Sequence, residues 1–151
     1  MDVEEIKQNW LNREFDVAEF PITQERILAY VHACGETDPR FSDPEHPEFQ
    51  APPTFTAQYV GRRILPRDFP MLGFRGFDAG KTVVLHGPAR PGDMLFGHST
   101  IADAYEKTGR SGRMVFLVHR MEFVNQKEER VSTVDWRMVR QPDAEPEKSQ
   151  K

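Results

Sequence analysis

Residues 35–43 read GETDPRFSD and residues 51–55 read APPTF, and these two pieces decide how the chain folds. The span from Glu36 to Pro53 is rich in proline, aspartate and glutamate, a composition that favours an ordered loop. From Thr54 to Leu65, apolar residues recur at helical spacing, and Pro66 ends the pattern. Because prolines flank this segment and more than one of its faces is apolar, the sequence predicts a buried helix over Thr54–Leu65.

Upstream of this loop, the sequence predicts a helix, a short strand and a second helix. Glu4–Asn12 has an apolar side and acidic residues at its start, which suit a helix dipole. Glu14–Phe20 alternates like a strand, and Pro21 is expected to end it. The second helix should begin after Thr23, a good N-cap, and end at Gly35.

Downstream of Pro66, the sequence predicts a loop followed by antiparallel strands. The loop covers Arg67–Gly80, and later polar turns are expected over 109–112 and 125–130. The predicted strands are Thr82–Ala89, Met94–Tyr105, Met114–Val124 and Val131–Val139. Proline, glutamate, lysine and serine then predict a disordered tail over residues 141–151. Helices followed by an antiparallel meander indicate the α+β class, with residues 1–140 forming one domain.

Composition and charge exclude several classes of function. The chain has 151 residues, of which 38% are hydrophobic and 29% charged, as in soluble globular domains. A net charge of −4 argues against a broad nucleic-acid surface, and no apolar run is long enough to cross a membrane. The single cysteine, Cys34, is expected to be buried and has no partner for an internal disulfide, which favours a cytoplasmic protein. The histidines have no metal-ligand spacing.

The loop at residues 35–43 resembles the active-site loop of MaoC-like (R)-specific enoyl-CoA hydratases and 3-hydroxyacyl dehydratases, which reads Gly-Asp-x-Asn-Pro-x-His-x-Asp. The matching residues are Gly35, Pro39 and Asp43. Two further pieces are similar to this family, RPGD at residues 90–93 and YEKTGRSG at residues 105–112. The likeness extends from Ile6 to Arg140. It implies a hot-dog fold, in which an antiparallel sheet wraps a central buried helix, and a lyase that acts on acyl thioesters in fatty acid metabolism.

The same resemblance shows departures at the two catalytic positions. In the family, an Asp and a His hold a water molecule and move its proton during hydration of an enoyl thioester. Glu36 stands at the Asp position and Phe41 at the His position, and a phenyl ring cannot accept a proton. Glu36 would therefore act alone as a base, or would only cap the chain or meet solvent. Asp38, at the Asn position, and Asp43 are interpreted as braces of the loop.

A third departure concerns the group that donates to the thioester carbonyl. Similar hydratases use the backbone N–H of a glycine at the start of the central helix. Pro53 matches that position and has no N–H. Thr54 would donate instead or would cap the helix, and Phe55 is a further candidate for substrate contact. His86 is also a candidate, because its predicted strand should run near the central helix.

Four basic residues are candidates for binding the phosphates of coenzyme A, or equally for a solvated basic face. They are Arg90, Lys107, Arg110 and Arg113. The substrate implied by the resemblance is an acyl thioester of coenzyme A or of a carrier protein, and no cofactor or metal is expected.

Three functions are compatible with these residues. The first is a MaoC-like subunit that shapes an acyl-thioester site and pairs, as a heterodimer, with a catalytic subunit that has the intact Asp and His. The second is a self-sufficient homodimeric hydratase that uses Glu36, with His86 as a possible helper. The third is a non-enzymatic acyl-CoA binding module.

Overall fold

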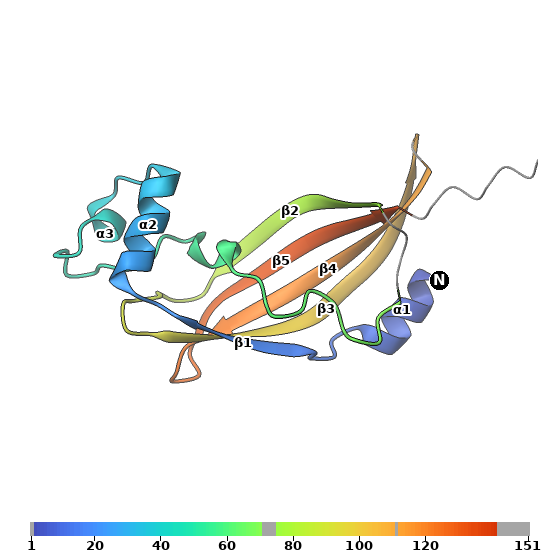
Figure 1. Ribbon diagram of the computed structural model, residues 1–151, viewed down its shortest axis with the longest axis horizontal. Helices are drawn as coiled ribbons and strands as arrows, with labels where there is room; N and C mark the ends of the chain where they lie inside the picture. Colours follow the sequence, from blue (N-terminus) through green and yellow to red (C-terminus); the bar gives the residue numbers. More distant parts are fainter. Residues whose placement is uncertain (1, 71–74, 111, 142–151) are drawn as a thin grey trace, which may run out of the picture.

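The fold is built on one antiparallel sheet with few helices (Figure 1). The computed structural model describes residues 2–70, 75–110 and 112–141. The helical elements are α1 (Val3–Trp10), α2 (Gln24–Cys34), α3 (Pro39–Ser42) and the 3₁₀ turn η1 (Phe55–Gln58). The strands are β1 (Asp16–Pro21), β2 (Arg75–Leu85), β3 (Met94–Gly109), β4 (Gly112–Val124) and β5 (Arg130–Gln141). The five strands lie in the order β1-β3-β4-β5-β2, which confirms the α+β class.

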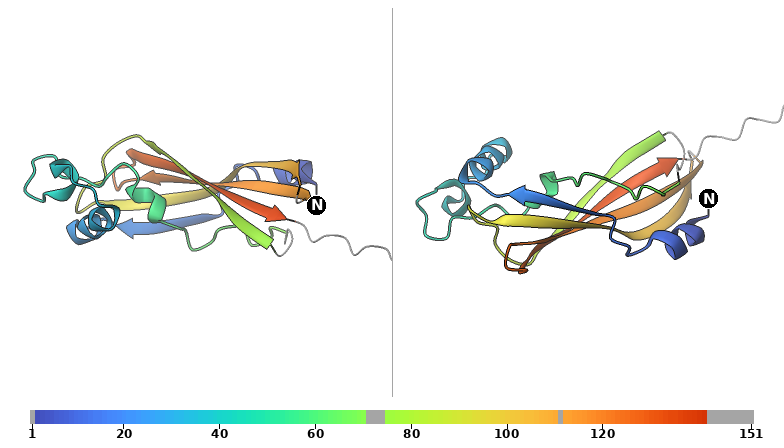
Figure 2. Two further views of the ribbon diagram at one scale, coloured as in Figure 1. Left: turned by 90° about the horizontal axis from the view of Figure 1, so that it is seen from above. Right: turned by 60° about the horizontal axis from the view of Figure 1, so that its bottom comes forward.

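The three central strands, β3, β4 and β5, are 16, 13 and 12 residues long and form the middle of the sheet. Along the first half of β3, buried residues alternate with half-buried ones, and β4 pairs with β3 and β5 in antiparallel register. The sheet is strongly twisted (Figure 2). Helices α2 and α3 lie at one end of it and α1 at the other, while residues 59–70, the crossing segment, run over one face between them (Figure 1).

The two predicted N-terminal helices form, with the expected end signals. The Thr23 side chain accepts the backbone N–H of Arg26 at 3.2 Å, and Gly35 ends α2 in the left-handed region at φ 70°. Asp2 caps α1 in the same way, through the N–H of Glu4 at 3.3 Å. These caps satisfy backbone donors that a helix leaves unpaired. The ends of α2 were predicted from Thr23 and Gly35, whereas α1 begins and ends one or two residues earlier than the predicted Glu4–Asn12.

The prediction of a helix over Thr54–Leu65 is wrong in its length. Only η1 is helical, and the chain after it is extended or bent. The apolar residues of this stretch serve two different cores: Phe55 and Tyr59 pack at one end of the sheet, and Ile64 and Leu65 at the other. A helix advances about 1.5 Å per residue and an extended chain about 3.3 Å, so the extended form reaches further along the sheet.

Other predicted boundaries also change. The region predicted as a loop over Arg67–Gly80 enters β2 at Arg75, and β2 ends at Leu85 rather than Ala89. A register shift between Asp78 and Lys81, with Gly80 at φ 88°, hides the strand pattern there. The predicted tail lies outside the described residues apart from Gln141, which ends β5.

Three smaller corrections concern the start of β1, a cysteine and a loop. Pro21 is the last residue of β1, so the strand ends there as expected, although it begins at Asp16 rather than Glu14; a missing N–H is tolerated because β1 is an edge strand. Cys34 is exposed, not buried, because it faces away from the core on the last turn of α2. The predicted loop over 36–53 contains one short helix, α3, which begins at Pro39.

Two separate groups of buried side chains hold the sheet to the segments that cover it. The first core joins α2, α3, the loop before η1 and one end of the sheet, and includes Ile22, Ile27, Val31, Phe41, Phe49, Phe55, Leu95 and Phe123. The second core joins α1 and the other end of the sheet, and includes Val3, Ile6, Trp10, Phe69, Leu117 and Met138.

Candidate functional site

The Glu36 carboxylate lies just after the end of α2 and holds the loop that follows it. Its Oε1 accepts the backbone N–H groups of Thr37 at 2.8 Å and Asp38 at 2.9 Å. The residue is half-buried. One carboxylate oxygen is thus engaged in shaping the loop, as in the interpretation of Glu36 as a capping residue.

Asp38 and Asp43 both accept backbone N–H bonds within the same loop. Asp38 caps α3 through the N–H of Arg40 at 2.9 Å, and Asp43 accepts the N–H of Glu45 at 3.0 Å. The side chain of Arg40 also lies 3.7 Å from Asp38 Oδ2. Both aspartates thus bond to backbone groups of the loop, since short acidic side chains bond readily to the backbone two residues on.

Phe41 is packed into the first core, with 8% of its surface exposed. The Arg40 guanidinium lies 4.8 Å from the centre of its ring. The His86 Nε2 is engaged elsewhere: it lies 2.9 Å from Thr133 Oγ1 and 3.1 Å from a guanidinium nitrogen of Arg130. Among the described residues, no hydrogen bond links Glu36 to a histidine.

The positions at the start of η1 are engaged in packing and in one hydrogen-bond pair. Pro53 is exposed, whereas Phe55 is buried and meets Tyr30 and Tyr59 edge-on. The Tyr30 hydroxyl lies 2.8 Å from Thr54 Oγ1 and also donates to the Thr54 carbonyl at 3.2 Å. Burial raises the pKa of Tyr30, so the phenol stays protonated and can donate.

The basic candidates do not gather at one place. Arg90 lies in the turn between β2 and β3, where its N–H donates to Asp93 at 2.8 Å. Lys107 and Arg113 lie at the far hairpin of β3 and β4, where Arg113 pairs with Glu106 at 2.7 Å. Arg110 is exposed in the same hairpin. The two groups lie at opposite ends of the long sheet (Figure 1), so they do not form one phosphate site within a single chain.

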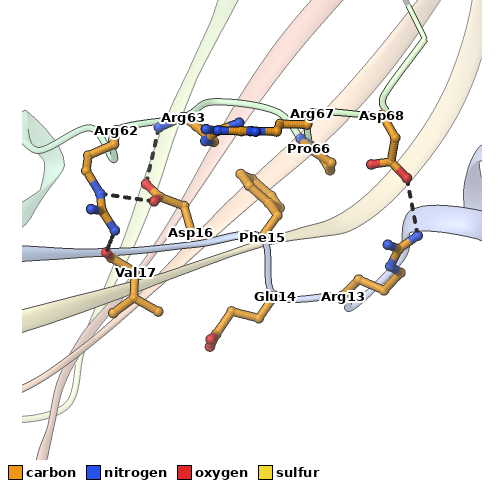
Figure 3. Close-up of a pocket in the computed structure, with 10 residues that line it drawn as sticks. All are labelled: Arg13, Glu14, Phe15, Asp16, Val17, Arg62, Arg63, Pro66, Arg67 and Asp68. Atoms are coloured by element: carbon orange, nitrogen blue, oxygen red, sulfur yellow. Dashed lines mark hydrogen bonds and ion pairs between the residues drawn. The ribbon is translucent and has the colours of Figure 1, made fainter.

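A groove that the sequence did not reveal lies between β1 and the crossing segment (Figure 3). It has a volume of about 810 Å³ and is lined by Arg13, Glu14, Phe15, Asp16, Val17, Arg62, Arg63, Pro66, Arg67 and Asp68. Asp16 is the buried residue that builds it: its Oδ2 accepts the N–H of Arg63 at 3.2 Å, and its Oδ1 lies 3.3 Å from Arg62 Nε. In the sequence, the sign that could have pointed to this groove is the pair Arg62 and Arg63 directly after Gly61.

Within the described part of the chain, a few buried side-chain polar atoms have no hydrogen-bond partner. They belong to Tyr59, Ser99 and His119, with Trp10 elsewhere in the second core. His119 is only 3% exposed, and burial, followed by the charge of Lys81, lowers its pKa to about 4. Lys81 itself donates to the Ala57 carbonyl at 2.7 Å, and burial lowers its pKa. No pattern in the sequence pointed to these buried polar groups, because Tyr59, Lys81, Ser99 and His119 lie in four separate segments.

Within the ranges that the structure describes, no three histidine, cysteine or acidic side chains gather as a metal site would require. None of the helices in the same ranges is long and apolar enough to cross a membrane.

The five-stranded antiparallel sheet with few helices is a hot-dog fold, which the chain shares with MaoC-like dehydratases of known structure. The chain belongs to the FAS1-like, dehydratase domain region family, whose family model matches residues 9–134. No curated protein matches it.

Solved structures share the fold at low sequence identity. The ChsH1-ChsH2 complex from Mycobacterium tuberculosis contains a chain with TM-score 0.69 and 21% identity, covering 94% of this chain and 95% of that one. A MaoC-like dehydratase from Rhodospirillum rubrum has TM-score 0.58 and 20% identity, covering 91% and 97%. The HadBC (3R-hydroxyacyl-ACP dehydratase) complex from Mycobacterium tuberculosis has TM-score 0.60 and 18% identity, covering 92% and 98%.

Proposed function

We propose that this chain is the non-catalytic subunit of a heteromeric hydratase or dehydratase, and that it shapes an acyl-thioester site whose Asp and His come from a second MaoC-like chain. The reaction of the complex would be hydration of an enoyl thioester or dehydration of a 3-hydroxyacyl thioester. One observation carries the proposal: at the position of the family's proton carrier stands Phe41, buried in the first core.

The chemistry explains why this observation matters. Adding water to an enoyl thioester requires a group that accepts and returns a proton near neutral pH, and such groups contribute about 100- to 10,000-fold in rate. Phe41 has no such group, and Glu36 uses one carboxylate oxygen to hold two backbone N–H groups. Pro53 has no N–H for a developing oxyanion. The Thr54 hydroxyl is paired with Tyr30. The reaction would need no cofactor beyond the thioester itself.

Two of the similar structures support a paired role. Their names describe complexes, ChsH1-ChsH2 and HadBC, and the second is a 3R-hydroxyacyl-ACP dehydratase. A chain of the same fold that lacks a proton carrier is expected to work beside one that has it. We place this pair in the cytoplasm, where the exposed Cys34 thiol would stay reduced.

The edge strand β2 offers a surface for the partner. Phe77, Val84 and Leu85 of β2 are 56%, 51% and 46% exposed. β2 also ends the sheet that the described residues form, so no described strand lies beside one row of its backbone N–H and C=O groups. A second hot-dog sheet placed there would pair the backbone groups and cover the apolar side chains.

One feature keeps a homodimeric hydratase as the second candidate. In the described part of the chain, Glu36 Oε2 has no hydrogen bond, since both backbone contacts fall on Oε1. That oxygen could hold a water molecule opposite a second copy. A non-enzymatic acyl-CoA binding module is the third possibility, and it shares the same geometry.

The test is a hydration assay with a trans-enoyl-CoA, in which the reaction is measured as the loss of enoyl absorbance. The assay compares the hydration rates of three samples: the chain alone, a MaoC-like partner with intact Asp and His, and the co-expressed pair. We expect no turnover by the chain alone, and turnover by the pair that exceeds that of the partner alone. Turnover by the chain alone that disappears in Glu36→Gln would support the homodimer. If the pair is no more active than the partner alone, the result would favour the third candidate function, a non-enzymatic acyl-CoA binding module.

A further inference from the structure

A small cavity lies where the two cores meet, beneath the start of the crossing segment. Its lining consists of Tyr59, Val60, Lys81, His119, Met121, Val134 and Trp136. Met121 and Val134 belong to the first core, whereas Trp136 packs against the second. The space open to the centre of a water molecule is about 10 Å³. A space of roughly 10–15 Å³ on that measure holds one water molecule, provided that polar groups face it.

His119 brings a polar group without a protein partner to this cavity. Its side chain is 3% exposed, and in the described part of the chain its Nε2 is buried and has no hydrogen bond. Because burial, followed by the charge of Lys81, lowers its pKa to about 4, the imidazole is neutral at neutral pH. A neutral imidazole has one N–H donor and one nitrogen acceptor. A buried polar atom that stays unpaired destabilises the folded chain, which favours a hydrogen-bond partner at this place.

Lys81 brings hydrogen-bond donors to the same cavity. The register shift in β2 between Asp78 and Lys81 sets which face of the sheet this side chain takes, since a slip of one residue turns a side chain to the other face. Its Nζ donates to the Ala57 carbonyl at 2.7 Å and lies 5.0 Å from the centre of a Trp136 ring. An ammonium group has three N–H donors, so donors remain beyond the one that Ala57 accepts. Burial lowers the pKa of Lys81, because the ammonium has lost part of its contact with solvent.

We propose that this cavity binds one water molecule as part of the folded structure, and that the water accepts an N–H of Lys81 and donates to Nε2 of His119. The direction of these bonds follows from the chemistry: an ammonium group only donates, so the water turns a hydrogen toward the imidazole. Nε2 of His119 is then the acceptor, and the ring carries its proton on Nδ1.

Such a water molecule would join strands that do not touch. His119 lies on β4 and Lys81 on β2, with β5 between them, and Lys81 also holds the Ala57 carbonyl of η1. The bound water would therefore link η1 and both strands at the place where the two cores meet. The inference goes beyond the proposed function, which rests on Phe41 and involves neither Lys81 nor His119.

NMR of the full, unchanged chain tests the proposal, at neutral pH and in a buffer without chloride. We expect nuclear Overhauser cross-peaks between the His119 ring protons and a long-lived water molecule, and ¹⁵N shifts of that ring that show the proton on Nδ1. His32, on the exposed side of α2, is the internal control and should show no long-lived water. The absence of the His119 cross-peaks, or a proton on Nε2, would overturn the proposal. A change in the His119 signals on addition of chloride would also overturn it, because the occupant would then be an anion.

A pair of variants separates a bound water from exchanging side-chain protons. Val134→Ile adds one methylene to a wall of the cavity and should displace the water, so the His119 cross-peaks should be lost. Val131→Ile adds the same group to a fully buried residue of the same strand and core that does not line the cavity, and should keep them. Because Val134→Ile retains both Lys81 and His119, cross-peaks relayed by their exchanging protons would survive it and would overturn the proposal. Loss of the cross-peaks in both variants would do the same.

Discussion

Asp16 shows how one residue can organise a whole surface. Its carboxylate is buried at the edge strand and binds both the backbone of Arg63 and the side chain of Arg62. Gly61 lies against it: a Cβ there would come 2.7 Å from Asp16 Oδ2 and 3.2 Å from Ser99 Oγ. A glycine is therefore required at this point, because any side chain would push the carboxylate away from its partners.

We accordingly expect Gly61→Ala to lower the free energy of unfolding by about 1–3 kcal/mol, the usual cost of forcing extra atoms into a packed site. Chemical denaturation measures this. Gly109→Ala is the matched control, because its Cβ would meet, among the described residues, only the flexible end of Met114, at 3.4 Å. Equal stability of the two variants would show that the crossing segment is not held by Asp16.

His119 makes the stability of the protein depend on pH. Burial, followed by the charge of Lys81, lowers its pKa from 6.5 to about 4, while Asp16 and Asp135 oppose the shift. Below pH 6.5, His119 therefore binds a proton in the unfolded chain, whereas in the folded chain it binds that proton only near pH 4. The stabilisation is complete above pH 6.5 and falls by about 3 kcal/mol as the pH drops to 4.

His119→Gln should remove that part of the pH dependence. Between pH 7.5 and about 4, the unfolding free energy of the unchanged protein should fall by about 3 kcal/mol relative to that of the variant. His32→Gln, on the exposed side of α2, is the control and should follow the unchanged protein. Parallel profiles for His119→Gln would mean that His119 takes up its proton in the folded state as readily as in the unfolded one.

At the scale of elements, the sequence predicted those helix ends and strands that depend on contacts between residues close in the chain. Thr23 and Gly35 set the ends of α2 through bonds within a few residues, so the sequence was sufficient there. The alternation in β3 and β4 was readable for the same reason. The crossing segment was mispredicted because its conformation depends on Asp16, more than 40 residues earlier in the chain, and on two cores that a helical pattern does not distinguish.

The edge strand β2 should be the element that associates with a partner. A lysine at position 84 would place a charge on the exposed apolar edge, so Val84→Lys is expected to prevent association while leaving the fold intact. Light scattering of the chain, alone and with a catalytic partner, should change from the mass of a dimer to that of a monomer. Thr108→Lys, exposed on β3 away from this edge, is the control. A dimer that survives Val84→Lys would place the interface elsewhere.

At the scale of the molecule, the fold class followed from the sequence, whereas the chemistry of the site did so only in part. The frame of Gly35, Pro39 and Asp43, with Phe41 in place of a histidine, was visible directly. The groove and the buried polar atoms were not, because the contact of Asp16 with Arg63 and the burial of His119 depend on segments far apart in the sequence. A motif of residue types at fixed spacing can be recognised in a sequence. A site whose side chains meet only through contacts between distant segments cannot.

The two separate cores have a consequence for how the molecule opens. Ile6 in the second core and Ile27 in the first are both fully buried, so their truncation to alanine removes a similar contact from opposite ends. In amide hydrogen exchange, Ile6→Ala should speed exchange mainly in α1, and Ile27→Ala mainly in α2. Equal acceleration at both ends in either variant would contradict this. If the ends open independently, a partner that closes one of them leaves the other free to admit a ligand.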